Sequence, residues 1–351
     1  MSVYLISCGL SILTMHIGSY YGGKQVNKWV LAFFSALPMI LVAAFRYGVG
    51  VDYLLTYKSY FDMVETGMLQ QKDKMELIYH YLNVVTSALN GDFFIVTAFC
   101  AVLFYLFVYG FLVEASPSPC LSIFLLTGMG FVFVAFNAMR QMVGCAIIFY
   151  ALRYVKERRF WPFAALVAVA AGFHSSCVLF LPVYLFPKIK IRPWLAFLLS
   201  AVVIAFGNTI TWVALNFISQ TRYGIYIASI FDTGKTAWVM LLINLILLAF
   251  LSVVYSDNEN YQLYYNLQLV SVWIIYFSGR IVLSLRLLWM FGLPSIISLP
   301  MALERIPRER DRKLCTGVVV LLYLAYTLYT VGLQNSNGVL PYRTIFGEWM
   351  A

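Results

Sequence analysis

The residues of this sequence that could do chemistry are few and stand against an apolar background. Only 11% of the 351 residues are charged, and 62% are hydrophobic. Three side chains could exchange a proton with a substrate, namely Asp52, Glu76 and His174. A second group could bind an anionic or sugar-containing substrate through guanidinium, amide or phenol groups: Arg46, Tyr53, Tyr79, Arg140, Gln141, Arg280 and Arg286.

This combination of side chains suits the transfer of a sugar from a diphosphate. Guanidinium groups match phosphate oxygens, and clustered arginines can bind a diphosphate and stabilise its departure. A carboxylate or imidazole nearby can take the proton from an attacking hydroxyl. If arginines stabilise the developing charge, such a reaction needs no metal ion. The predicted external loops contain no D-x-D motif and the six cysteines form no C-x-x-C pair, so we predict neither a metal nor a cofactor.

Each of these side chains also has a purely structural interpretation. Arg46 could be an anchor at a helix end that extends to the membrane interface. Asp52 and Glu76 could be solvated loop carboxylates, and His174 could be a hydrogen-bonded packing residue. Arg140 stands near the start of a predicted helix, where the helix dipole disfavours a cation. Its structural alternative is therefore a salt bridge.

The elements that position these residues are long apolar segments. About 20 apolar residues cross a bilayer as a helix, and in lipid every backbone amide must be bonded within the segment. We therefore predict an all-α polytopic membrane protein of about twelve transmembrane helices, forming a single domain over residues 1–351. The predicted helices are 2–21, 29–45, 93–113, 120–136, 138–155, 160–173, 175–187, 193–215, 237–255, 263–283, 286–303 and 314–332.

The basic residues between these helices predict the orientation. Twelve crossings with an external N-terminus place four basic clusters in the cytoplasm, as the positive-inside rule requires. In a membrane chain the net charge of +9 then reflects topology and does not indicate nucleic acid. The same topology puts the candidate residues on the extracytoplasmic side of the plasma (inner) membrane. Ionisable groups at membrane depth are costly, so they are functional candidates.

Two segments need separate predictions. Residues 46–92 form a large extracytoplasmic loop, in which 63–69 and 75–89 could be amphipathic helices at the interface. Residues 160–187 are an apolar run that is interrupted around Gly172 and His174. One tilted helix would be long, whereas two crossings keep both flanking basic clusters inside. We therefore predict a hairpin with His174 at its outer tip.

Several short motifs resemble those of a known family. The string from Arg46 to Tyr53, followed by Tyr57 and Phe61, resembles the R-x-G-x-G-x-D-Y-x-x-Y-x-x-x-F signature of the EpsG family of Wzy-type polysaccharide polymerases. The later elements of that family, E-x-x-Y, R-Q-x-x-A, F-H-x-S and a Pro-Tyr in the tail, look like Glu76 to Tyr79, Arg140-Gln141 with Ala146 beyond, Phe173 to Ser176, and Pro341-Tyr342. The motifs keep the family's order over nearly the whole chain.

The resemblance implies an enzyme of O-antigen, capsule or exopolysaccharide synthesis. Such a polymerase moves a growing glycan from one polyprenyl diphosphate carrier onto the repeat unit of another and releases polyprenyl diphosphate. The resemblance also implies the metal-independent GT-C-like fold shared with O-antigen ligases, and a chain-length regulator as a partner protein. The family's functional residues match Arg46, Asp52, Glu76, Arg140 and His174, and further along the chain Arg286.

Two other classes of function remain open from the residues. A transporter or flippase of the same lipid-linked oligosaccharide should carry polar residues along a path reached from both faces, whereas the internal face here offers mainly basic loops. A membrane acyltransferase also uses a histidine, but usually within a longer motif or beside an acidic partner.

The sequence departs from the family's motif after Glu76. The family's glutamate is often followed by Pro-Gly, where Leu77 and Ile78 stand here. The motif therefore does not fix the direction of the Glu76 side chain.

Overall fold

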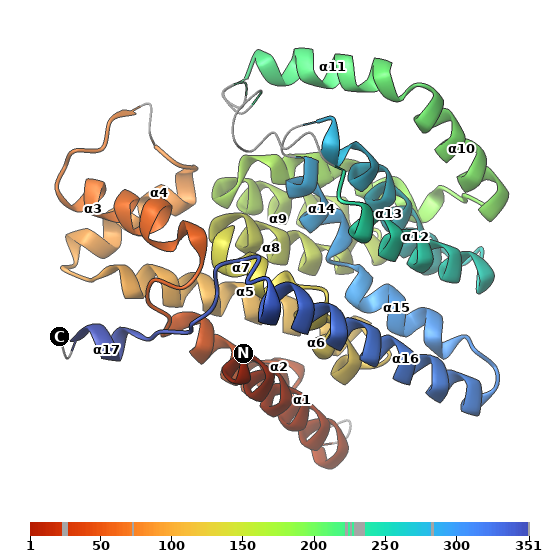
Figure 1. Cartoon of the computed structure of the whole chain (residues 1–351), viewed down its shortest axis with the longest axis horizontal. Coiled ribbons are helices and arrows are strands. Elements are labelled where there is room, and N and C mark those ends of the chain that lie inside the picture. The colour runs from red at the N-terminus through yellow and green to blue at the C-terminus, as the bar shows by residue number, and fades with distance from the viewer. Residues whose placement is uncertain are drawn as a thin grey trace. The chain divides into compact units, whose positions relative to one another are not determined.

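The secondary structure of the described residues is built from helices joined by loops. The computed structural model describes residues 1–351 except 23–26, 72–73, 222–223, 225–226, 228–235, 282–283 and 350–351. Among these residues the regular structure is helical, and an isolated β-bridge joins Arg46 to Thr344 (Figure 1). Each of the twelve segments predicted from the sequence overlaps helix among the described residues, and residues 282 and 283 of the segment 263–283 lie outside them. The predicted all-α class is confirmed.

The chain, predicted as one membrane domain, is built from two compact units. Unit 1 comprises Met1–Leu179 and Pro307–Ala351, and unit 2 comprises Phe180–Ile306. The elements of unit 1 are α1 (Ser2–Gly22), α2 (Lys28–Ala44), η2 (Tyr53–Lys58), α3 (Ser59–Glu65), α4 (Leu77–Ala88), α5 (Phe93–Ala115), α6 (Pro119–Gly128), α7 (Phe131–Asn137), α8 (Met139–Lys156), α9 (Phe160–Phe173), the start of η4 (Ser175–Lys188), α16 (Glu309–Thr327), η7 (Leu328–Leu333) and α17 (Ile345–Trp349). The elements of unit 2 are the rest of η4, α10 (Pro193–Ala205), α11 (Gly207–Ser219), α12 (Trp238–Val253), α13 (Glu259–Tyr276), η6 (Phe277–Gly279), α14 (Ser284–Gly292) and α15 (Ser295–Glu304).

Within unit 1 the long helices pack in sequence. Helix α2 packs against α1 and α5, α5 packs against α8, and α8 packs against α9. Helices α3 and α4 lie beside each other, and α4 contacts α5 and α9 (Figure 1). The segment that carries Glu76, at the start of α4, is thereby held against α9 and α5. Within unit 2, α13 packs between α12 and α14.

The apolar helices are those of a membrane protein. Among the described residues, three helical segments are long and apolar enough to cross a bilayer, namely 2–21, 93–115 and 309–333. Three further pairs would each qualify as one bent span, with bends of 51° between α6 and α7, 66° between α10 and α11 and 45° between α14 and α15. The shorter apolar helices are α2, α9, η4 and α12. Twelve crossings are therefore not confirmed, and three helices predicted as continuous are broken.

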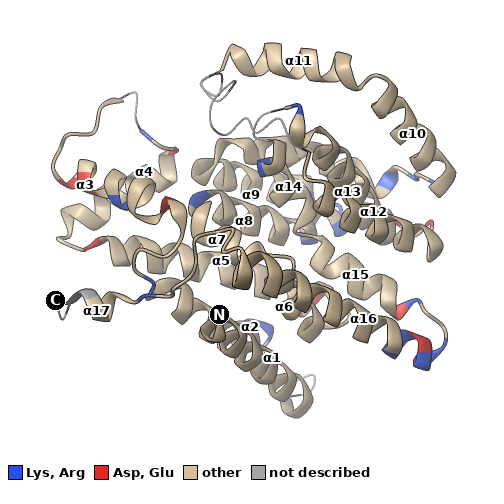
Figure 2. Cartoon of the chain, viewed as in Figure 1, with Lys and Arg blue, Asp and Glu red and all other residues tan. Residues whose placement is uncertain are grey.

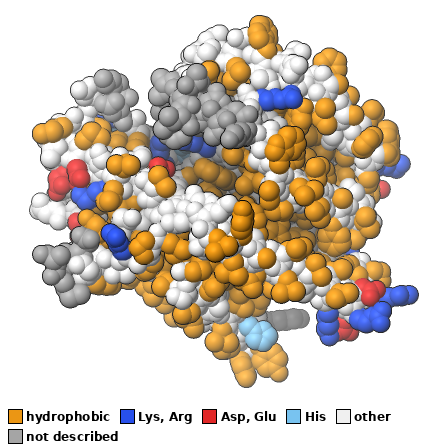
Figure 3. Space-filling view, in the orientation of Figure 1, with side chains coloured by type: hydrophobic (Ala, Val, Ile, Leu, Met, Phe, Trp, Pro, Cys, Tyr) orange, Lys and Arg blue, Asp and Glu red, His pale blue; other side chains and the backbone are white. Residues whose placement is uncertain are grey.

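The distribution of side chains agrees with a lipid environment. Long stretches of helix carry no charged side chain (Figure 2), and hydrophobic side chains dominate the visible face (Figure 3). Trp161 and Phe197 are each 80% exposed and Trp212 is 67% exposed. Exposed apolar surface of this extent is unusual for a monomer in water, and it is the expected covering of helices that face lipid.

The first loop corrects one helix prediction and confirms another. The helix predicted at 75–89 is α4, but the one predicted at 63–69 is wrong, because η2 and α3 together occupy 53–65. Four aromatic residues with helical spacing, Tyr53, Tyr57, Tyr60 and Phe61, are all buried along this segment. The helix ends before Gly67, whose φ is +69°. The spacing of these aromatic residues is a sequence signal that could have located this helix, and the prediction did not use it.

The segment 160–187 breaks where the sequence predicted, but its second half is not an α-helix. Helix α9 ends at Phe173, His174 is extended, and η4 is a 3₁₀-helix of 14 residues. Pro182 and Pro187 lie inside η4 and lack the amide donors that an α-helix requires. A 3₁₀-helix rises about 2.0 Å per residue, so η4 is about 28 Å long. That length is close to the hydrocarbon thickness of a bilayer, and the return of η4 across the membrane stays a prediction.

Candidate active site

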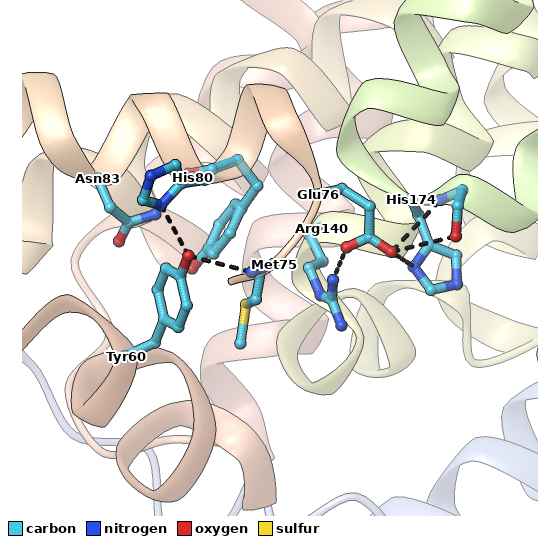
Figure 4. Close-up of polar contacts among 9 residues, drawn as sticks. Tyr60, Met75, Glu76, His80, Asn83, Arg140 and His174 are labelled. Carbon is cyan, nitrogen blue, oxygen red and sulfur yellow. Dashed lines mark hydrogen bonds and ion pairs between the residues drawn. The ribbon is translucent and has the colours of Figure 1, made fainter. Parts of the chain in front are cut away.

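The carboxylate of Glu76 is the centre of a cluster of polar side chains from three elements. Glu76 precedes the first residue of α4, and its side chain does not cap its own helix. It forms an ion pair with Arg140, which lies in the first turn of α8 (Figure 4). On its other side, Glu76 Oε1 lies 3.6 Å from Nδ1 of His174, the residue that follows α9. The structure therefore places three of the predicted site residues together.

A fourth residue contacts the same carboxylate. The backbone N–H of Ser175 lies 3.4 Å from Glu76 Oε1, and its hydroxyl donates to the same oxygen at 3.3 Å. Ser175 belongs to the motif that follows Phe173, yet it was not among the predicted site residues. Its position next to His174 was the only sequence signal for its role.

Two glycines let the three elements approach each other. A methyl group on Gly172 in α9 would lie 2.5 Å from Ile78 Cδ1, so the first turn of α4 packs directly on the last turn of α9. A methyl group on Gly144 in α8 would lie 3.2 Å from the carbonyl oxygen of Ala170. Close contact of α8 and α4 with the end of α9 brings Arg140 and Glu76 to His174.

The cluster is shielded from solvent, but less so at Arg140. The side chains of Glu76 and His174 are each 5% exposed, whereas that of Arg140 is 21% exposed. At low dielectric the attraction between opposite charges is stronger than in water, so the ion pair of Glu76 with Arg140 is stronger here than the same pair would be on an exposed surface. The exposed part of the Arg140 guanidinium has further N–H donors for an anionic ligand.

This arrangement can orient a histidine for proton transfer. Because Nδ1 of His174 faces the carboxylate, the tautomer with the proton on Nδ1 is favoured. Transfer of a substrate proton then uses Nε2, as in carboxylate–histidine pairs of other enzymes. The extended backbone of His174 (φ −154°, ψ 113°) ends α9 and turns this side chain toward Glu76.

Arg46 occupies a different environment from Arg140. It is 2% exposed, its Nη1 donates to the carbonyl oxygen of Ala43 at 2.8 Å, and its guanidinium lies 4.5 Å from the ring centroid of Phe136. The ring of Tyr53 lies 5.6 Å away. In this structure Arg46 ties the first loop to the end of α2, and its role as a diphosphate ligand stays a prediction.

The other predicted residues of unit 1 lie in or beside the core of the loop. Tyr53 is buried against Phe93, and Tyr79 is buried against the rings of Tyr57 and Tyr60. Gln141 is 3% exposed in α8. Asp52 is half-buried and occupies the position before η2.

The two remaining predicted arginines belong to unit 2. Arg280 is exposed after η6, and its guanidinium lies 5.0 Å from the ring centroid of Tyr276. It also lies close to Gly207, where an added methyl group would be 2.9 Å from its Nη1. Arg286 is half-buried in α14. Their predicted binding of diphosphate stays a prediction.

The tail of the chain holds the glycine-rich string of the first loop. The N–H of Gly50 donates to the carbonyl oxygen of Gly338 at 3.0 Å, and the N–H of Val51 donates to Asn137 Oδ1 at 2.6 Å. Asn137 Nδ2 in turn donates to the carbonyl oxygen of Asn337 at 2.9 Å. Loop and tail are therefore in direct contact, and their predicted placement on the extracytoplasmic side stays a prediction.

We expect Gly50→Ala to destabilise the protein more than Gly48→Ala. Gly50 has a φ of +102°, and an added methyl group would lie 3.0 Å from the carbonyl oxygen of Phe136. Strain of this kind costs about 1–3 kcal/mol. Gly48 has a φ of +60°, but the nearest atom would be 3.6 Å away, so its cost is only the backbone term of about 1–2 kcal/mol. Thermal unfolding in detergent measures both, and equal shifts would show that the contact with α7 is unimportant.

Among the described residues, no group of three or more His, Cys, Asp or Glu side chains is placed to hold a metal ion. Of the two predicted catalytic carboxylates, Asp52 and Glu76, it is Glu76 that lies 3.6 Å from Nδ1 of His174. The described contacts of the cluster bring together a carboxylate, an imidazole, a guanidinium and the Ser175 donors.

Comparison with known proteins identifies a family over most of the chain. The family model described as the EpsG family matches residues 29–344. The matched region includes every residue of the Glu76 cluster. Searches of curated proteins and of solved structures find no match.

Proposed function

Because this chain belongs to the EpsG family, whose members are Wzy-like polysaccharide polymerases, we propose that it polymerises oligosaccharide repeat units carried on polyprenyl diphosphate. The resemblance predicted from the motifs is confirmed by the family match. The observation that carries the finer proposal is the shielded cluster of Glu76, Arg140 and His174. It supplies an oriented base next to a guanidinium.

In the proposed reaction, a hydroxyl of the acceptor repeat unit attacks the anomeric carbon of the donor glycan. The bond from that carbon to the donor diphosphate breaks, and a bond to the acceptor oxygen forms. His174 takes the hydroxyl proton through Nε2, while Glu76 fixes the ring and stabilises the imidazolium. Arg140 offers its exposed donors to the departing polyprenyl diphosphate. Asp52, Arg46 and Arg286 remain proposed as further contacts of the substrates.

We place the reaction at the extracytoplasmic face of a bacterial plasma membrane. The basic loops support this orientation through the positive-inside rule. The lipid bilayer, the two lipid-linked substrates and a chain-length regulator are the proposed partners.

The proposal is tested by incubating purified protein with lipid-linked repeat units. A polymerase produces a ladder of lengthened glycans and releases polyprenyl diphosphate. A transporter or flippase of the same lipid, the alternative function, moves the lipid across vesicles without lengthening it. Transport without a ladder would replace the proposed function by the alternative.

We also expect polymerisation to continue in excess chelator, since the arginines stabilise the leaving diphosphate. The measurement is the length of the ladder with and without EDTA. Loss of the ladder that magnesium or manganese restores would contradict metal independence.

A further inference from the structure

A tyrosine and a histidine fix the backbone on either side of Glu76. The hydroxyl oxygen of Tyr60 in α3 accepts a hydrogen bond from the N–H of Met75 at 3.1 Å, and it lies 2.9 Å from Nδ1 of His80 in α4 (Figure 4). The N–H of His80 donates to the carbonyl oxygen of Glu76 at 2.8 Å. Met75 and His80 are therefore both fixed, one before and one after the carboxylate.

The direction of the Tyr60–His80 hydrogen bond depends on the tautomer of His80. A phenol has a single proton, and the Tyr60 oxygen accepts from the N–H of Met75. In the neutral imidazole with its proton on Nε2, Nδ1 of His80 is an acceptor, and the Tyr60 hydroxyl donates to it. Tyr60 is 2% exposed, and burial raises the pKa of its phenol. The donor therefore keeps its proton at neutral pH.

We propose that Tyr60 and His80 are positioning residues that hold the Glu76 carboxylate toward Arg140 and His174. The inference rests on the proposed function, because it assigns the support of the same site. Glu76 has an extended backbone (φ −58°, ψ 152°) and no hydrogen bond from its side chain to its own helix. The side chain therefore follows the direction in which the chain enters α4. That direction is set by the bond from Met75 to Tyr60.

The support depends on the protonation of His80. The groups that face this imidazole are the phenol of Tyr60 from α3, the ammonium of Lys74 from the entering segment and the ring of Tyr81 from α4. Partial burial, and then Lys74, lower the pKa of His80 below its usual 6.5. A lowered histidine pKa favours the neutral folded form, so this stabilisation is complete above pH 6.5 and is lost as the pH falls through the lowered pKa. When Nδ1 of His80 is protonated it becomes a hydrogen-bond donor, so the Tyr60 hydroxyl loses the acceptor to which it donates.

The test compares Tyr60→Phe with Tyr109→Phe. Both remove one hydroxyl from a buried tyrosine that has a hydrogen bond, and Tyr109 bonds to Ser11 between α5 and α1, outside the site. We expect Tyr60→Phe to lower kcat by about 10–100-fold with little change in KM, as for a displaced catalytic group. Tyr109→Phe should keep the wild-type kcat.

Hydrogen exchange separates this inference from the proposed function. Backbone amides of residues 74–80 should exchange about tenfold faster in Tyr60→Phe than in the wild type at pH 7.5, since one hydrogen bond is lost. Acid should accelerate the same amides in the wild type beyond the chemical effect of pH, and not further in Tyr60→Phe. If the wild-type protein forms no ladder, the proposed function fails. The exchange result then still tests whether Tyr60 and His80 hold the backbone around Glu76. Unchanged kcat and unchanged exchange in Tyr60→Phe would overturn the positioning role of Tyr60 and His80.

Discussion

Replacing Glu76 by glutamine is expected to abolish polymerisation while the protein remains folded. Glutamine has nearly the same volume, but it removes the negative charge that pairs with Arg140 and orients His174. In the Ser-His-Asp triad of serine proteases, loss of the carboxylate that orients the histidine lowers kcat by about 10⁴-fold. Loss of general-base catalysis lowers rates by about 10²–10⁴-fold. We therefore expect at least a 100-fold loss of ladder formation.

The matched control is Glu65→Gln. Glu65 ends α3 in the same loop and is exposed to solvent, so its neutralisation should leave the rate of polymerisation unchanged. Rates measured from single turnovers, together with thermal unfolding in detergent, distinguish lost chemistry from lost structure. Glu76→Gln protein with at least half of the wild-type rate would remove the carboxylate from the catalytic site.

Removing the guanidinium of Arg140 is expected to have two separable effects. The carboxylate of Glu76 is 5% exposed in the structure, and Arg140→Ala removes the cation paired with it. Breaking a buried pair by removing one partner costs about 3–5 kcal/mol, and the partial exposure of Arg140 favours the lower end of this range. Ladder formation should also be lost, because the departing diphosphate no longer meets a guanidinium.

Lysine and a double variant resolve these effects. Arg140→Lys keeps the charge, so most of the stability should return, but the loss of the planar fork should still impair transfer. Arg140→Ala combined with Glu76→Gln removes both charges, and it should be more stable than Arg140→Ala alone. Full activity of Arg140→Lys would limit the arginine to a structural salt bridge with Glu76.

The sequence alone determined the class of the protein and most of its helical segments. An apolar run of bilayer length must satisfy its amides internally, so composition and run length are enough to predict helix. The interruption at His174 was also visible, since polar residues and a glycine interrupt an apolar run, and α9 ends at the preceding residue. The spacing of the motifs identified the EpsG family, which the match over residues 29–344 confirms.

Local geometry inside those segments was less predictable. Hydropathy measures how apolar a segment is and carries no information on its direction, so the bends of 51°, 66° and 45° in the paired helices were not foreseen. The 3₁₀ form of η4 was not predicted either, because Pro182 and Pro187 indicate that regular α-helical hydrogen bonding is interrupted but not which form replaces it.

Only the tertiary structure decided which polar residues meet. Ser175 and Glu76 are 99 residues apart in the sequence, yet they share a hydrogen bond, and Arg140 is paired with Glu76 while Arg46 turns toward Phe136. Both arginines follow or begin an apolar helix, so their sequence environments are alike. Their partners differ because the close packing of α4, α8 and α9 at Gly172 and Gly144 leaves a shielded carboxylate next to one of them and aromatic rings next to the other.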